Sequence, residues 1–112
     1  MRRRTAGSDR GRWLAAQRAA EETHQKKARA LARERRLDEL AREETAAWSR
    51  VDALIATRKP AEYDATTTLV TDLQALAERN GHHDKFAHRI TALRQTHARK
   101  PSLIERLDRA GM

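Results

Sequence analysis

The sequence predicts an all-α protein in which a long N-terminal helix packs on a small antiparallel helical bundle. Residues 12–57 contain neither Gly nor Pro, and Ala, Arg, Glu, Leu and Lys dominate them. These residue types are the strongest helix formers. The two prolines of the chain and its Asn80-Gly81 pair then divide the remaining residues into three segments of helical length.

Charge and apolar residues are distributed in opposite directions along the chain. Residues 1–36 carry twelve Arg and Lys against four acids, which accounts for the whole formal charge of +8. Residues 37–112 hold twelve basic and twelve acidic residues and most of the large apolar ones. We therefore predict a disordered basic tail over residues 1–11, a basic helical arm over 12–36 and a small helical domain over 37–112.

The first predicted helix covers residues 12–57, and its second half carries an apolar stripe. The stripe follows steps of three and four residues, with Glu44 and Ala47 interposed, and is wide enough to dock on a body. The first half shows no such stripe, so we expect the helix to leave the body near Leu37. The packing or interface residues that this pattern selects are Leu37, Leu40, Trp48, Val51, Leu54 and Ile55.

Three further helices are predicted from their boundary signals. Pro60 ends the first helix, and a second follows over residues 61–79. Asn80 and Gly81 tolerate the left-handed conformation that stops a helix, which places a third helix over residues 83–98, with His97 against its apolar side. Pro101 at a favoured first position begins a short last helix, which Gly111 terminates.

A short internal repeat accompanies two of these boundaries. Arg58-Lys59-Pro60 recurs as Arg99-Lys100-Pro101, 41 residues later. Each copy ends one predicted helix and starts another. The spacing lies in the range of helical repeats, and it favours a stack of α-hairpins.

Few residues point to catalysis or to a bound cofactor. The chain has no Cys, which excludes disulfides, thiolate nucleophiles and every Cys-containing zinc site. No two of its five His residues have the i,i+4 spacing of a helical metal pair. Glycine-rich phosphate loops and the G-x-S-x-G motif are absent as well. We expect a protein that is not an enzyme and that holds neither a metal nor a cofactor.

The expected location is the cytoplasm. No apolar run of the sequence approaches the roughly 20 residues of a membrane span, and its Arg-rich start lacks the apolar segment of a secretory signal. A composition without Cys fits a reducing compartment. We expect no membrane contact.

The basic arm is the main candidate for a functional surface. Its cations could neutralise the phosphates of a nucleic acid or contact an acidic protein. Only Trp13 adds an aromatic side chain, so base stacking is poorly supported and binding should depend weakly on base sequence. The candidate contact residues are Arg2, Arg3, Arg4, Arg10, Arg12, Arg18, Lys26, Lys27, Arg29, Arg33, Arg35 and Arg36.

Three function classes remain open. The first is a non-enzymatic interaction module with a protein partner, as an accessory protein in a nucleic-acid-associated complex. The second is a direct, weakly sequence-specific DNA- or RNA-binding protein that acts through residues 2–36. The third is a purely structural, coiled-coil-like homo-oligomer in which the apolar stripes of residues 37–55 pair between chains.

The sequence also resembles a known family. The segments ATRKPAEYD, LVTDLQALAERNG and HARKPSLIERLDRAG are similar to the C-terminal helical region of actinobacterial SWIM zinc-finger proteins, and RWLAAQRAAEE is similar to the segment that follows the zinc finger. The resemblance implies a DNA- or protein-interacting role. The zinc ligands of the family, C-x-C followed by C-x-H, have no counterpart in this chain.

Overall fold

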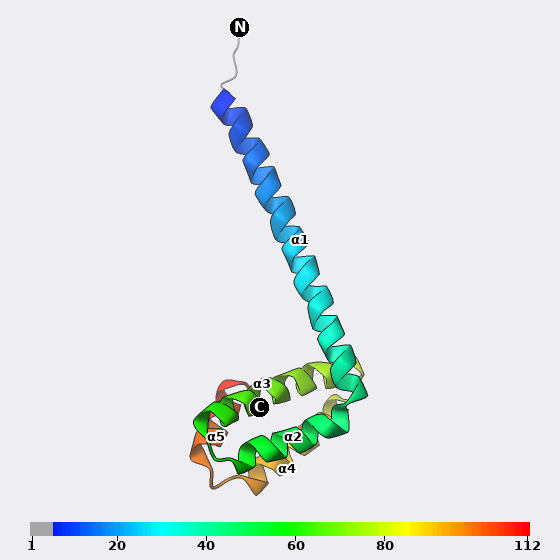
Figure 1. The fold of residues 1–112 in the computed structure, drawn as a ribbon, viewed down its shortest axis with the longest axis vertical. Helices are drawn as coiled ribbons and strands as arrows, with labels where there is room; N and C mark the ends of the chain where they lie inside the picture. Colours follow the sequence, from blue (N-terminus) through cyan, green and yellow to red (C-terminus); the bar gives the residue numbers. More distant parts are fainter. Residues whose placement is uncertain (1–5) are drawn as a thin grey trace. The chain divides into compact units, whose positions relative to one another are not determined.

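The structure is all-α, as the sequence predicts. A computed structural model describes residues 6–112, with side chains from Asp9 onward. The described residues contain no strand. They form α1 (Ala6–Arg42), α2 (Glu44–Ala56), α3 (Pro60–Arg79), α4 (His83–Thr96) and α5 (Pro101–Arg109) (Figure 1). The chain divides into two compact units, Met1–Arg35 and Arg36–Met112, one residue before the predicted boundary of the small domain. We call the second unit the body.

The helical arm begins earlier than predicted. Residues 6–11 belong to α1, so the expectation of a disordered tail is wrong for them, and residues 1–5 lie outside the described part of the chain. The local reason is electrostatic. Asp9 lies in the first helical turn, where the positive end of the helix dipole favours a carboxylate. Its side chain also approaches the Arg12 guanidinium, at 3.8 Å.

The predicted continuous helix over residues 12–57 is wrong in one respect, because it breaks at Glu43. The Glu43 N–H donates to the Leu40 carbonyl at 3.0 Å, three residues back instead of four, and α2 starts at the next residue. Neither Gly nor Pro marks this position. The break redirects the chain so that α2 packs along α3. The free energy gained from this packing exceeds the cost of interrupting the helix.

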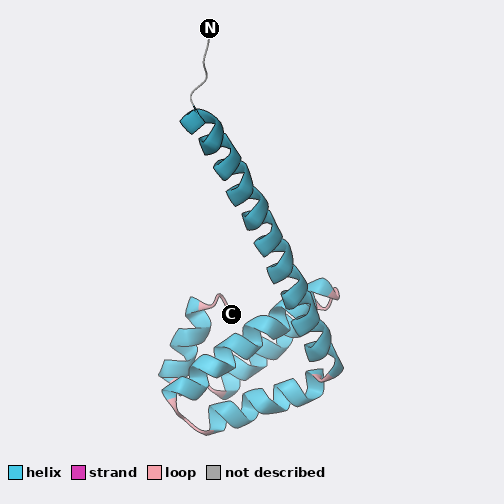
Figure 2. Ribbon diagram, turned by 45° about the horizontal axis from the view of Figure 1, so that its top comes forward, coloured by secondary structure: helices cyan, strands magenta, loops and turns pink. Residues whose placement is uncertain are grey.

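Helix α3 is the centre of the body, because it contacts α2, α4 and α5 (Figure 2). Its Val70 is fully buried, and so is Thr66, whose hydroxyl donates to the Glu62 carbonyl at 2.8 Å. This bond satisfies the buried polar atom. The remaining buried apolar core residues are Leu37, Ala47, Trp48, Val51, Ile55, Tyr63, Leu73, Leu76, Phe86, Ile90, Leu93, Leu103 and Leu107.

An aromatic contact joins α2 to α4. The rings of Trp48 and Phe86 lie 6.0 Å apart between centroids and are tilted by 44°. The Arg89 guanidinium lies over the Trp48 ring, 4.3 Å from its centroid. Both arrangements are favourable for the aromatic quadrupole. They hold α4 against α2, although the main partner of both helices is α3.

Glycine caps end α3 and α5 as the sequence predicts. Gly81 has φ of 73°, and the N–H of His82 donates to the carbonyl of Ala77 at 2.8 Å. Gly111 has φ of 79°, and the N–H of Met112 donates to the carbonyl of Leu107 at 2.9 Å. Both are Schellman arrangements, in which only glycine avoids the steric cost of a left-handed residue.

The end of α2 has the same left-handed geometry without a glycine. Arg58 has φ of 57° and is the sole non-glycine residue of the described chain with a positive φ. Its N–H donates to the Ile55 carbonyl at 3.2 Å, and the Thr57 hydroxyl donates to the Leu54 carbonyl at 2.8 Å. The same hydroxyl accepts the Lys59 N–H at 3.3 Å. These bonds hold Arg58 in a conformation that costs roughly 1–2 kcal/mol.

The connections α2–α3 and α4–α5 lie at the same end of the body in both ribbon views (Figures 1 and 2). Pro60 and Pro101 are the first residues of the helices that follow them. The two Arg-Lys-Pro segments therefore meet in space, although 41 residues separate them in the sequence.

Truncating a core residue of the short helix α5 tests how far the body depends on it. Leu107 is fully buried, so Leu107→Ala should lower the free energy of unfolding by about 2–5 kcal/mol. Urea unfolding followed by near-UV circular dichroism measures this. Leu31→Ala is the matched control, because Leu31 is 58% exposed and its loss should change stability by less than about 0.5 kcal/mol.

Replacing Arg58 by glycine should stabilise the body. Arg58→Gly removes the left-handed strain and should raise the free energy of unfolding by about 0.5–1 kcal/mol. The same substitution at the exposed, mid-helical Arg50 should lower it by about 1 kcal/mol. An Arg58→Gly protein that is no more stable than the parent in urea unfolding would contradict this account.

Candidate functional site

The exposed face of α1 carries a row of cations. Every described side chain from residue 9 to residue 36 is exposed. With 3.6 residues per turn, Arg18, Lys26, Arg29 and Arg33 fall within about 80° around the helix axis and span about 22 Å along it. We call these four residues the basic row. One carboxylate, that of Glu22, shares this side of the helix.

The other predicted contact residues do not join the basic row. By helical geometry Arg10, Arg12, Lys27 and Arg35 lie on other sides of α1. Arg36 belongs to the body, where its guanidinium lies 3.5 Å from the Asp72 carboxylate. Arg2, Arg3 and Arg4 lie outside the described residues.

Two large apolar residues of α1, Trp13 and Leu31, lie on the side opposite the basic row. Trp13 and Leu31 are separated by about five helical turns and therefore share one direction. They are 60% and 58% exposed, and Leu14 is 40% exposed. Sequence reasoning noted Trp13 but did not separate it from the cations. The positions of these residues around the axis of α1 separate Trp13 from the cations.

The apolar stripe over residues 37–55 packs inside the chain itself. Leu37, Trp48, Val51 and Ile55 are buried in the body. Leu40 and Leu54 are half-buried. The predicted pairing of these faces between two chains would need side chains that the body already covers.

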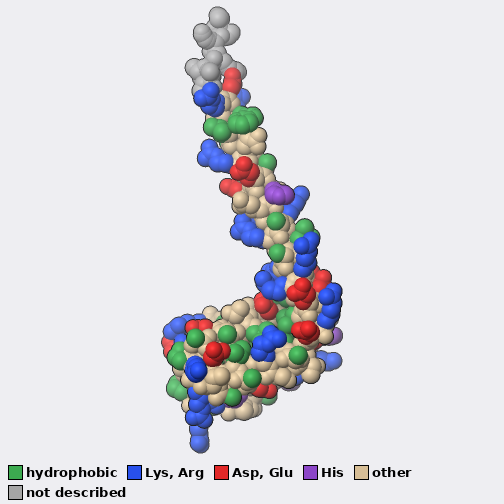
Figure 3. Space-filling model, in the orientation of Figure 1, with side chains coloured by type: hydrophobic (Ala, Val, Ile, Leu, Met, Phe, Trp, Pro, Cys, Tyr) green, Lys and Arg blue, Asp and Glu red, His purple; other side chains and the backbone are tan. Residues whose placement is uncertain are grey.

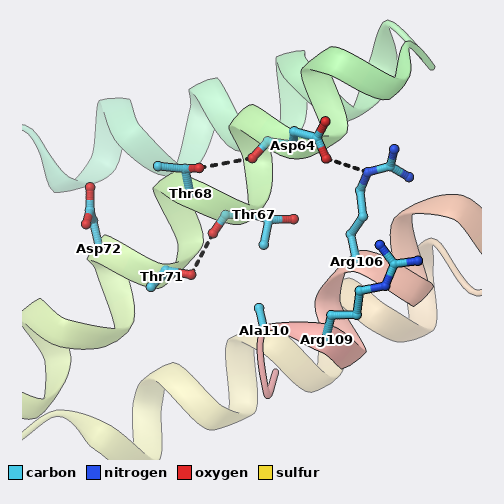
Figure 4. A pocket seen from close by; sticks show the side chains of 8 residues that line it. All are labelled: Asp64, Thr67, Thr68, Thr71, Asp72, Arg106, Arg109 and Ala110. Atoms are coloured by element: carbon cyan, nitrogen blue, oxygen red, sulfur yellow. Dashed lines mark hydrogen bonds and ion pairs between the residues drawn. The ribbon is translucent and has the colours of Figure 1, made fainter.

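The hollow between α3 and α5 holds many polar groups that are already bonded (Figure 4). It measures about 500 Å³. The hydroxyls of Thr68 and Thr71 donate to backbone carbonyls four residues back. The Arg106 guanidinium donates to the Asp64 carboxylate at 2.6 Å, and Arg109 pairs with Glu105. The cations here are neutralised by the chain's own acids.

A second hollow, of about 460 Å³, lies where the two Arg-Lys-Pro segments meet. Its lining residues are Arg58, Pro60, Tyr63, Arg99, Lys100, Pro101 and Ser102. The sequence repeat was the available signal for it, but that repeat predicted only a hairpin stack. We call this feature the RKP hollow.

His97 is half-buried and contacts Lys100, one of the lining residues of the RKP hollow. Its Nδ1 lies 3.0 Å from the Lys100 ammonium. Partial burial and the charge of Lys100 lower the pKa of His97 below its ordinary value of 6.5, while Asp52 acts in the opposite direction. The neutral imidazole ring of His97 accepts a hydrogen bond from the Lys100 ammonium.

Neither a metal-binding cluster nor a membrane span is found among the described residues. No group of three or more His, Cys, Asp and Glu side chains is placed to hold a metal ion within residues 6–112. In the same part of the chain, no helix combines the length and the apolar character needed to cross a bilayer.

Comparisons with family models, curated proteins and solved structures gave no match to this chain. The resemblance to the helical region of SWIM proteins therefore stays a prediction from the quoted segments.

The lowered pKa of His97 has a measurable consequence. An NMR titration of its ring proton should give a midpoint below 6.5, and Lys100→Gln should raise that midpoint. Because the folded state binds this proton less readily than the unfolded state, the stabilising contribution is complete above pH 6.5. It declines as the pH falls from 6.5 through the lower folded-state pKa. A midpoint at or above 6.5 would contradict the burial argument.

Proposed function

We propose that the protein is a non-enzymatic helical module that binds the phosphate backbone of a nucleic acid through the basic row of α1. The observation that carries the proposal is the placement of four exposed cations on one side of a continuous helix. A protein gains affinity for a phosphate backbone when several Lys and Arg side chains neutralise phosphates and release their counterions.

The spacing of the basic row suits such a target. Neighbouring members from Lys26 to Arg33 are three or four residues apart, about 4.5–6 Å along the axis. A single strand of duplex DNA carries one phosphate per 3.4 Å of helix axis, so a 22 Å row faces about six phosphates. Four of these could be contacted at one time. Backbone contacts of this kind fix orientation but do not read base sequence.

A nucleic acid fits this face better than an acidic protein does. Hot spots of protein interfaces are enriched in Trp, Tyr and Arg, and they cluster in well-packed, desolvated pockets. The basic row contains no aromatic residue, whereas Trp13 and Leu31 lie on the opposite side of the helix.

A protein partner is the second candidate, on the other side of the helix. The 60% exposed Trp13 favours it, because tryptophan is the residue type most enriched among interface hot spots. The two surfaces could serve an accessory protein that joins a nucleic acid to another chain. Trp13→Ala should then weaken capture of the partner while leaving duplex affinity within about twofold.

Neutralising part of the basic row should reduce both affinity and salt dependence. With four phosphates contacted, log K for a labelled duplex should fall against log salt with a slope near −3.6 between about 50 and 300 mM salt. The double variant Arg29→Gln/Arg33→Gln should bring the slope to about −1.8. Fluorescence anisotropy measures the binding, and circular dichroism confirms that the helix remains.

The matched control removes two charges from other sides of the same helix. Lys27→Gln/Arg35→Gln has the same net charge as the Arg29→Gln/Arg33→Gln variant. It should leave the slope of log K against log salt near that of the parent protein. If the two double variants lose equal affinity, the attraction depends on overall charge, and the assignment to one face is wrong. A parent protein that fails to bind at about 50 mM salt would end the proposal altogether.

A further inference from the structure

The RKP hollow gathers positive charge that the body does not neutralise. Arg58 comes from the link between α2 and α3, and Arg99 and Lys100 come from the link between α4 and α5. Among the described residues, no carboxylate forms an ion pair with any of the three. Figure 3 shows Lys and Arg side chains projecting at this end of the body.

Elsewhere in the body, by contrast, several arginines form ion pairs with carboxylates. Arg79 pairs with Asp38 at 2.8 Å, Arg94 with Asp108 at 2.7 Å, and Arg106 with Asp64 at 2.6 Å. The chain thus has enough acids to pair cations across its helices, but none lines the RKP hollow. Like charges that converge without a counter-ion repel one another, and a bound anion removes that repulsion.

Two residues of the RKP hollow depart from the local preference of the backbone position that they occupy. Arg58 occupies a left-handed conformation that glycine would adopt without strain. Lys100 is the N-cap residue of α5, where the helix dipole disfavours a cation and the side chain makes no capping hydrogen bond. Departures from local preference of this kind are typical of functional positions.

The donors of the RKP hollow match one ligand chemistry. Each Arg guanidinium presents its donors in a planar fork that suits two oxygens of one phosphate. Lys100 spends one of its three N–H donors on His97 and keeps two. The volume of the RKP hollow, about 460 Å³, lies within the range of small-molecule sites.

We propose that the RKP hollow, formed by Arg58, Arg99 and Lys100, is a binding site for a phosphate group. The phosphate belongs either to a small phosphorylated molecule or to the backbone of a nucleic acid. The site lies wholly in the body, so it is independent of the basic row of α1 and of the function proposed for that helix.

Titration of the full chain with inorganic phosphate, followed by NMR at constant ionic strength, tests the site. The amide signals of residues 58–63 and 99–103 should shift saturably, with a dissociation constant of about 1 mM. The signals of α1 should not follow the same curve. Shifts that grow linearly and equally over α1 and the body would reflect general screening and would overturn the proposal.

Arg58→Gly is the decisive variant, because it should fold at least as well as the parent and still lose a phosphate ligand. It and Arg99→Gln should each weaken phosphate binding about tenfold, as expected for a lost charge-assisted contact. Arg50→Gln is the matched control, since Arg50 is an exposed cation of α2 outside the hollow and should bind phosphate as the parent does. Equal affinity of Arg58→Gly and the parent would refute the assignment.

A second titration separates the two sources of the phosphate. It uses a short DNA duplex and the Arg29→Gln/Arg33→Gln protein, in which the basic row is weakened. Duplex-induced shifts at residues 58–63 and 99–103 would assign the site to a nucleic-acid backbone. Shifts with inorganic phosphate alone would assign it to a small phosphorylated molecule. Absence of both responses would exclude the site without bearing on the basic row, whose own test uses the slope of affinity against salt.

Discussion

The packing of α3 against α2, α4 and α5 is the constraint on which the rest of the body depends. Among the described helices α3 alone makes extensive contacts with three others, and its Val70 and Leu73 belong to one core cluster with residues of α2, α4 and α5. The break at Glu43 follows from it, because α2 must run along α3. The burial of Leu103 and Leu107 follows as well, since a helix of nine residues is not stable without tertiary contacts.

Electrostatic pairing divides the cations of the chain into two kinds. In the body, arginines such as Arg79 and Arg106 meet carboxylates that come from other helices. These pairs are largely exposed and each contributes little to stability, but they leave the surface of the body nearly neutral. The basic row of α1 and the lining of the RKP hollow do not follow this pattern. Both proposals for function rest on those exceptions, one on an exposed helix face and the other on an open hollow.

The body carries a basic hollow of about 460 Å³, and α1 carries four exposed cations on one side. The two surfaces share a preference for phosphate, and they differ in shape. An exposed helix face suits an extended polymer, whereas a hollow lined by Arg58, Arg99 and Lys100 suits a phosphate group. Trp13, on the other side of α1, offers a different chemistry, and it is the feature that a protein partner would use.

The sequence by itself determined the helical class, the ends of the helices at Pro60, Gly81, Pro101 and Gly111, and the separation of charge from apolar residues. Those properties depend on local backbone preference and on side-chain periodicity, which neighbouring residues encode. Only the tertiary structure decided the break at Glu43 and the meeting of Arg58 with Arg99 and Lys100. A periodic apolar stripe looks the same in a straight helix and in a bent one. Residues 41 positions apart become neighbours only when α3 and α4 have packed between them, so the RKP hollow could not be read from either segment alone.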